Sequence, residues 1–160
     1  MTVPADDIDR LMAVMSTAFD PQYREAWSRR QVEDSLVVGN TRYGLVAESG
    51  LPPVPNEPAA GFYLSRAAAD EEELLLFAVV PDCRGTGLGR TLLDRLFADA
   101  ADRGIAKIFL EMRANNPARR IYTRYGFEPI GRRERYYRTT TGQNIDAVTF
   151  AKAVNKGSDR

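Results

Sequence analysis

The residues from Arg84 to Gly89 place three glycines just before a helical pattern, and this combination suits the binding of a phosphate. The apolar run 74–80 precedes them and predicts a buried strand that Pro81 ends. Glycine has no Cβ, so a ligand can approach the backbone closely. The first amides of a helix have no partner within the helix. A strand, a glycine loop and a helix in this order therefore predict a phosphate site at the helix N-terminus.

The spacing in this loop excludes two common phosphate motifs. A Walker loop ends in Gly-Lys-Ser or Gly-Lys-Thr, and a dinucleotide loop has the form GxGxxG. Neither is present. The pattern that fits is Arg-x-x-Gly-x-Gly, formed by Arg84, Gly87 and Gly89. The alternative is a tight turn with no ligand, although three glycines at alternate positions exceed what a turn needs.

Glu111 and Tyr122 are the two side chains that we select as candidates for proton transfer. Glu111 stands in the otherwise apolar run 108–112, where a lone carboxylate is unfavourable unless it is paired or used. Burial would raise its pKa and make it a better base near neutral pH. The alternatives are an ion pair with a neighbouring arginine or a strand end in solvent. Tyr122 falls on the next helix, and core packing is its alternative.

The chain contains no histidine and only one cysteine, Cys83. These counts exclude Ser-His and Cys-His catalysis, histidine-based metal sites and an intrachain disulfide. We therefore expect no metal site and no acyl-enzyme on Cys83. The formal net charge is zero, which gives no general attraction to nucleic acid or membranes. No signal peptide or apolar run of membrane length is visible, so we expect a cytoplasmic protein.

The first half of the chain predicts two helices and then three strands. One helix opens at Asp6 or Asp7 and ends before Pro21, and a loop follows to Trp27. Ser28 and Gln31 have the spacing of a capping box for a second helix, which closes near Val38. Strands are predicted at 43–48, 60–65 and 73–80. Their short links favour an antiparallel meander.

The second half continues the sheet. The helix after the glycine loop ends at Gly104, and the strand 105–113 should run parallel to the central strand because a helix connects them. A helix capped by Asn115 or Asn116 follows, and strands at 128–132 and 144–151 are joined by a polar connection. We predict one mixed α/β (α+β) domain at 1–153, with a mostly antiparallel, twisted sheet and helices on both faces. A tail at 154–160 completes the chain.

The glycine loop resembles the acetyl-CoA loop of the GNAT superfamily of N-acetyltransferases, and the order of elements is similar to that fold. The resemblance implies a central sheet with a parallel pair of strands that splays at the acetyl-CoA site. It also implies a first strand, which would fall at Met1 to Pro4 and is short or missing here.

Later motifs resemble the RimI-like branch of that superfamily, the bacterial ribosomal-protein alanine N-acetyltransferases. They are FLEMRAN at 109–115, the Asn-x-x-Ala-x-x-Ile-Tyr series ending at Tyr122, YGF at 125–127, RRERYY at 132–137 and GQNIDA at 142–147. The resemblance covers residues 74–151 closely. It implies acetylation of the N-terminal alanine of a small-subunit ribosomal protein, by direct transfer in a ternary complex. Acetyl-CoA and that N-terminal peptide are the implied partners, with no requirement for nucleic acid or membrane.

Site residues follow from the same resemblance. Glu111 would be the general base, directly or through water, and Tyr122 the general acid toward the coenzyme A thiolate. The implied coenzyme residues are Phe77, Ala78 and Val79 for the acetyl and pantetheine arm, Arg84, Gly85, Thr86, Gly87, Leu88, Gly89 and Arg90 for the pyrophosphate, and Asn115 for the pantetheine.

Two features depart from the family pattern. The link from Arg113 to the asparagine is one residue short, so Asn115 or Asn116 could make the contact. The loop from Phe19 to Trp27 is longer than the common form and lies where the family receives its acceptor. Two other functions fit the same residues. One is a GNAT enzyme acting on a small amine or a lysine side chain, and the other is a non-catalytic acyl-CoA-binding regulatory module.

Charge is concentrated in two stretches. Asp70–Glu73 is acidic, and residues 113–138 hold eight arginines against two acids. We interpret both as solvated faces, which is the usual meaning of such runs. The basic stretch could also meet coenzyme phosphates or RNA.

Overall fold

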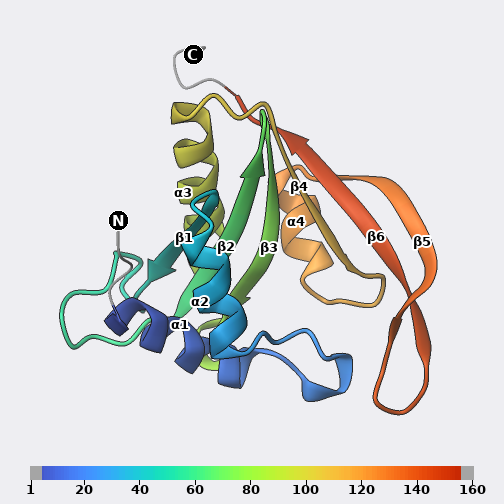
Figure 1. Cartoon of the computed structure of the whole chain (residues 1–160), viewed down its shortest axis with the longest axis horizontal. Helices are drawn as coiled ribbons and strands as arrows, with labels where there is room; N and C mark the ends of the chain where they lie inside the picture. The colour runs from blue at the N-terminus through green and yellow to red at the C-terminus, as the bar shows by residue number, and fades with distance from the viewer. Residues whose placement is uncertain (1–4, 156–160) are drawn as a thin grey trace.

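The computed structural model describes residues 5–155, which form one six-stranded sheet with helices on both faces (Figure 1). The strand order is β1-β2-β3-β4-β6-β5, and only β3 and β4 run parallel. The prediction of a mixed, mostly antiparallel sheet is confirmed. The strands are β1 (Thr41–Val46), β2 (Gly61–Ala68), β3 (Glu71–Val79), β4 (Lys107–Arg113), β5 (Glu128–Arg138) and β6 (Asn144–Ala153), and the helices are α1 (Ala5–Ala18), α2 (Arg29–Val37), α3 (Leu88–Asp102) and α4 (Arg119–Tyr125).

Two apolar clusters hold the helices to the sheet. Leu11 and Val14 of α1 and Val32 of α2 pack against Phe62 and Leu64 on one face. On the other face α3 and α4 pack through a second cluster that contains Leu92, Leu93, Leu96, Tyr122 and Phe150. All these side chains are buried, so the sheet is covered on both sides, as predicted.

The parallel pair β3–β4 is joined over a short length only. Glu71, Glu72 and Glu73 pair with Lys107, Ile108 and Phe109, and no later residues of the two strands pair. Directly after the paired residues, β3 carries a bulge opposite Leu64 and Ser65. Leu75 and Leu76 consequently both pack toward α1, whereas Leu74 packs toward α3. A bulge bends the strand that contains it, so β3 turns away from β4 and leaves a free edge.

Several local predictions are confirmed. Ser28 Oγ accepts from the Gln31 amide and Gln31 Oε1 accepts from the Ser28 amide, which completes the capping box of α2. Gly104 follows the end of α3 in the left-handed conformation, with φ of +78°. None of the helices between residues 5 and 155 is both long and apolar enough to span a bilayer.

Other predictions were wrong or fall outside the described residues. The expected polar connection after Arg132 is strand, because β5 continues to Arg138 through an irregularity at Arg135, whose φ is +53°. Almost every β5 residue is exposed, so its sequence lacks the apolar alternation that marks a strand. A strand at 1–4 lies outside the described residues, as does most of the predicted tail. Val154 still donates its amide to Ala106.

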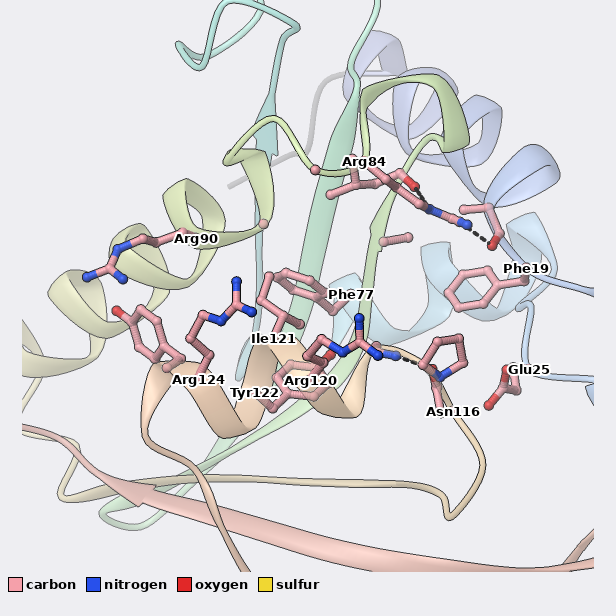
Figure 2. A pocket seen from close by; sticks show the side chains of 18 of the residues that line it. Phe19, Glu25, Phe77, Arg84, Arg90, Asn116, Arg120, Ile121, Tyr122 and Arg124 are labelled. Carbon is pink, nitrogen blue, oxygen red and sulfur yellow. Dashed lines mark hydrogen bonds between the residues drawn. The ribbon is translucent and has the colours of Figure 1, made fainter.

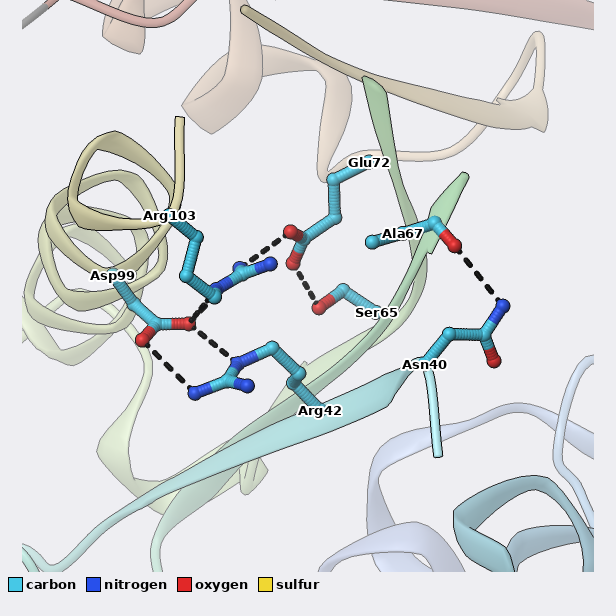
Figure 3. Close-up of polar contacts among 7 residues, drawn as sticks. All are labelled: Asn40, Arg42, Ser65, Ala67, Glu72, Asp99 and Arg103. Atoms are coloured by element: carbon cyan, nitrogen blue, oxygen red, sulfur yellow. Dashed lines mark hydrogen bonds and ion pairs between the residues drawn. The ribbon is translucent and has the colours of Figure 1, made fainter. Parts of the chain in front are cut away.

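A buried ionic cluster fixes the closed end of the β3–β4 pair (Figure 3). Glu72 is fully buried and accepts from the Ser65 hydroxyl and, at 2.5 Å, from Arg103 Nη2 at the end of α3. Asp99 joins Arg103 to Arg42 of β1, with 2.8 Å between Arg42 Nε and Asp99 Oδ2. The interpretation of the whole acidic run as a solvated face was therefore wrong for Glu72.

We expect Arg103→Ala to lower the free energy of unfolding by about 3 kcal/mol, because it leaves the Glu72 carboxylate buried without its cation. Arg30→Ala is the matched control, since Arg30 pairs with Asp34 on the exposed surface of α2 and should change the free energy by less than about 0.5 kcal/mol. Urea unfolding of both variants measures the difference. Equal, small losses would contradict the inference that the cluster stabilises the fold.

Candidate active site

A cavity of about 1050 Å³ opens where β3 and β4 part (Figure 2). Its walls come from the end of β3, the glycine loop, the start of α3, the segment from Arg113 into α4, and the long loop after α1. All the sequence-predicted coenzyme residues line it except Thr86 and Leu88. Tyr122 lines it as well, whereas Glu111 does not.

The glycine loop meets the cavity in a left-handed backbone conformation that glycine adopts without strain. Gly85 and Gly87 have φ of +80° and +91°, values that residues with a Cβ rarely adopt. No side chain caps α3 at Gly87, so the first backbone N–H groups of α3 are free to donate to a ligand. Thr86 instead donates its hydroxyl to the Cys83 carbonyl, and Leu88 is buried. The loop therefore offers backbone donors, as its sequence predicted.

Gly89 allows α4 to approach the start of α3. A Cβ at this position would overlap the Cδ1 atom of Ile121 and would lie 3.5 Å from the Phe77 ring. A larger residue here would have to displace the end of the Ile121 side chain, so glycine suits the close packing of α4 on the start of α3.

The side chain of Arg84 has a structural role in this state. Its Nε donates to the Val79 carbonyl at 3.0 Å and its Nη2 to the Ala18 carbonyl at 2.9 Å. These bonds tie the loop to β3 and to the end of α1, as Figure 2 shows. Two of the five guanidinium N–H groups are used in these bonds, so the others remain available to a ligand.

Arg90, Arg120 and Arg124 also line the cavity, and of these only Arg90 was among the predicted site residues. In Figure 2, Arg90 and Arg124 lie at one end of the view and Glu25 at the other. The sequence signal for Arg120 and Arg124 was the basic stretch 113–138. Both side chains are exposed, as the interpretation of this stretch as a solvated face predicts, and both also line the cavity, which leaves open the alternative of a contact with coenzyme phosphates. The result is a cationic end that suits phosphates.

The free edge of β3 forms another wall. Phe77, Ala78 and Val79 lie beyond the last residue that pairs with β4, so their backbone on that side has no strand partner. A free strand edge can bind an extended ligand through main-chain hydrogen bonds. The pantetheine arm, an extended chain with amide groups, is a ligand of that kind.

Tyr122 is buried at the wall of the cavity. Its ring lies 5.6 Å from the ring of Phe77 and 5.6 Å from that of Phe127. Burial, and then the negative charge of Glu25, raise the pKa of the Tyr122 phenol well above its usual range. The phenol is therefore protonated at neutral pH, as an unshifted tyrosine also is, and burial makes it a weaker acid than a tyrosine in water.

Glu111 lies outside the cavity in a bidentate ion pair with Arg133 of β5. Its two carboxylate oxygens accept from Arg133 Nη2 at 2.5 Å and Nε at 3.0 Å. The ion pair that the sequence left open as an alternative is thus present. Arg133 also stacks on the Tyr136 ring at 3.6 Å. Burial, and then Glu111 and Glu25, raise the pKa of Tyr137 to about 12, so both carboxylates act on this phenol.

Asn115 and Asn116 both line the cavity. Asn115 Oδ1 accepts from Arg113 Nη1 at 2.9 Å, and Asn116 Oδ1 accepts from the Ala118 amide at 2.9 Å. Asn116 thus holds the turn that leads into α4, and Asn115 positions Arg113. The one-residue shortening leaves both asparagines at the cavity, so the choice between them stays a prediction.

Sequence reasoning missed Glu25, which lies in the long loop after α1 and lines the cavity. Its Oε2 is 3.3 Å from Nε of Arg113, whose guanidinium stacks on Tyr23 at 3.5 Å. Burial raises the pKa of the Glu25 carboxyl, while the charge of Arg113 opposes that rise. The only sequence signal was the length of the loop, because a glutamate between Arg24 and Ala26 looks like an ordinary surface residue.

Cys83 lines the cavity next to the glycine loop. It is buried, and its Sγ lies 3.6 Å from Oε2 of Glu48. Burial and then this carboxylate raise the pKa of the thiol. The neighbouring group thus disfavours the thiolate, which is the nucleophilic form.

Comparisons with known proteins agree with this geometry. A model of the acetyltransferase (GNAT) domain family matches residues 40–129. The [ribosomal protein bS18]-alanine N-acetyltransferase of Escherichia coli strain K12 is 38% identical over 101 residues, which cover 62% of this chain and 68% of that protein. A putative enzyme of the same description from Bacillus subtilis strain 168 is 25% identical over 94% of this chain and 92% of its own.

Solved structures match over almost the whole chain. The crystal structure of the ribosomal-protein-S18-alanine N-acetyltransferase from Escherichia coli has a TM-score of 0.76 and 27% identity, with 100% of this chain and 96% of that chain covered. Arabidopsis thaliana NAA60 in complex with acetyl-CoA has a TM-score of 0.74 and 19% identity, with 96% of each chain covered. At 19% identity, the likeness to NAA60 shows a shared fold alone.

We expect Gly87→Ala to weaken the binding of acetyl-CoA about tenfold, because a side chain at φ +91° is strained by roughly 1–2 kcal/mol and shifts the first amides of α3. Gly104→Ala is the matched control. It introduces similar strain at the other end of the same helix, at a φ of +78°. Titration calorimetry measures the affinity. Equal affinities of the two variants for acetyl-CoA would contradict a role of the glycine loop in binding.

Proposed function

The chain belongs to the GNAT acetyltransferase family, and from this premise we propose that it acetylates the N-terminal amino group of a protein that begins with alanine. The family uses acetyl-CoA, and the curated relatives are N-acetyltransferases, so the reaction class is N-acetyl transfer. The proposed acceptor is ribosomal protein bS18, which appears in the descriptions of the relatives from Escherichia coli and Haemophilus influenzae.

One observation carries the proposal. A single cavity joins the glycine loop and the free edge of β3 to Tyr122 and to the long loop after α1. The loop and the arginines suit the phosphates of coenzyme A, and β3 suits its pantetheine arm. The end of the cavity at the loop after α1 is the proposed place for the amine. We propose that Arg90, Arg120 and Arg124 contribute to the binding of the phosphates, in addition to the backbone of the loop.

Acetyl transfer to an amine requires two kinds of proton movement. The ammonium must lose a proton before nitrogen attacks the thioester, and the departing sulfur must gain one. We propose that the Tyr122 phenol donates its proton to the sulfur, which its place in the wall of the cavity beside Phe77 supports. Glu111 is the base that the family pattern assigns. Because it lies outside the cavity and is paired with Arg133, it would act through water.

The transfer proceeds directly from acetyl-CoA to the amine in this proposal. Backbone donors on the free edge of β3 would stabilise the oxyanion that develops on the thioester carbonyl. An acetyl-enzyme on Cys83 is disfavoured, since that thiol is buried beside a carboxylate and its pKa is raised. A small amine or a lysine side chain remains the alternative acceptor, and a non-catalytic acyl-CoA module is the alternative function.

We expect the purified protein to add one acetyl group to a peptide that carries the alanine N-terminus of bS18, because the relatives are described by that acceptor. Mass spectrometry of the peptide measures the product. A peptide with a blocked N-terminus is the control, and it should gain no acetyl group. Acetylation of the blocked peptide would point to a lysine side chain. No acetylation of either peptide would reject the alanine assignment and call for a panel of amines.

We expect Tyr122→Phe to lower kcat by about 10²-fold, since positioned proton transfer contributes about 10²–10⁴-fold to such steps. The affinity for acetyl-CoA should change little, because the ring remains in place. Tyr43→Phe removes a phenol that donates to Asp7 on the α1 side of the sheet, outside the cavity, and is the matched control. Steady-state rates and calorimetry check both variants. An unchanged kcat in Tyr122→Phe would exclude the phenol as the acid.

A further inference from the structure

We propose that Glu25 contacts the acceptor's amino group and is the first acceptor of its proton, with Glu111 acting further from the nitrogen. This inference rests on the proposed function and assigns a role to the long loop after α1. It follows from the distribution of charge in the cavity, from the contacts of Arg113 and from the position of Tyr122.

The cavity has a cationic end and two carboxylates in its lining, of which Glu25 is the more buried. Two acids line it, Asp20 and Glu25. Asp20 Oδ1 already accepts from the Gln22 amide, as the cap of the short 3-10 turn Pro21–Tyr23. Glu25 lies away from the arginines that suit the coenzyme phosphates, as Figure 2 shows. An ammonium group that enters at this end meets the Glu25 carboxylate.

Arg113 can release Glu25 without losing its own position. Its guanidinium stacks on the Tyr23 ring at 3.5 Å, and its Nη1 donates to Asn115 at 2.9 Å. The Nε that faces Glu25 is buried and has no hydrogen-bond partner among the described residues, although an oxygen of Glu25 lies 3.3 Å away. The ion pair is therefore poorly aligned. A substrate ammonium, which has three donors, can replace it while Arg113 stays in place.

The groups around Glu25 favour the uptake of a proton by its carboxylate. Burial raises the pKa of its carboxyl, and the charge of Asp20 adds to the rise, while Arg113 of β4 opposes it. The charge of Glu25 also contributes, after burial, to the raised pKa of the phenols of Tyr122 on α4 and Tyr137 on β5. A carboxylate with a raised pKa takes a proton more readily near neutral pH.

Tyr122 and Glu25 line the same cavity, and the proposal gives each of the two proton steps its own partner. An N–H bond of the ammonium breaks, its proton passes to Glu25, and the freed electron pair attacks the thioester carbon. The C–S bond then breaks, and its electron pair stays on sulfur, which takes the proton of Tyr122. The phenolate takes the second proton of the nitrogen as the amide forms. Glu25 finally releases its proton to solvent, which balances the reaction.

The test compares Glu25→Gln, Glu25→Asp and Glu111→Gln across pH, with Glu33→Gln, an exposed acid of α2, as the control. We expect Glu25→Gln to lower kcat/KM about 10²-fold near neutral pH. Most of this loss should disappear above about pH 9, where the α-amino group, with a pKa of about 8, is already neutral. Glu25→Asp should recover part of the rate, and the affinity for acetyl-CoA should stay unchanged in all variants.

A loss in Glu25→Gln that is equal at every pH, or no loss, would overturn the proposal. Recovery at high pH in Glu111→Gln alone would return the role to Glu111. Urea unfolding checks that the variants are folded, and if Glu25→Gln is not, Glu25→Asp and its pH profile decide. The two proposals fail separately. If the wild type acetylates another amine and no alanine peptide, only the acceptor is wrong and the series is run on that amine; if it acetylates no amine, both are rejected.

Discussion

The parting of β3 from β4 is the constraint on which the rest of the structure depends. The two strands pair over three residues each and then separate, and everything that we assign to the cavity lies beyond that point. Two features hold the geometry. The Glu72–Arg103 pair fastens the closed end to α3, and the bulge at Leu75 turns β3 away directly after the pairing stops. On its other side β4 pairs along its whole length with β6, so it cannot follow β3.

An open strand edge is unfavourable in a protein, because it leaves backbone donors and acceptors without partners. Here the free edge faces the cavity, and the rings of Phe77 and Tyr122 pack beside it with their centroids 5.6 Å apart. An extended ligand along β3 would supply the missing backbone partners. The free edge, the glycine loop and the Tyr122 phenol thus lie in one cavity.

The sequence predicted those parts of the fold that local patterns specify. The capping box at Ser28, the glycine after α3 and the strand–loop–helix order all depend on residues close together in the chain. The bulge was not predictable, because Leu74, Leu75 and Leu76 are identical and nothing in them tells which side each faces. The end of β5 was missed because both its faces are exposed. Glu72 was misread because its cation, Arg103, lies 31 residues away.

The candidate site also contains some residues that local sequence predicts and others that depend on distant contacts. The glycine loop and Tyr122 carry short motifs, and both line the cavity, so the sequence grouped residues that the fold brings together. Glu111 carries the same kind of motif, yet it lies outside the cavity, because the arginine that pairs with it comes from β5. Glu25 has no motif, and only the folded chain brings it to Arg113 and Tyr122. The glycine loop is therefore specified by local sequence. The free edge of β3, which depends on the bulge, and the carboxylate of Glu25 reach the cavity only through the packing of distant segments.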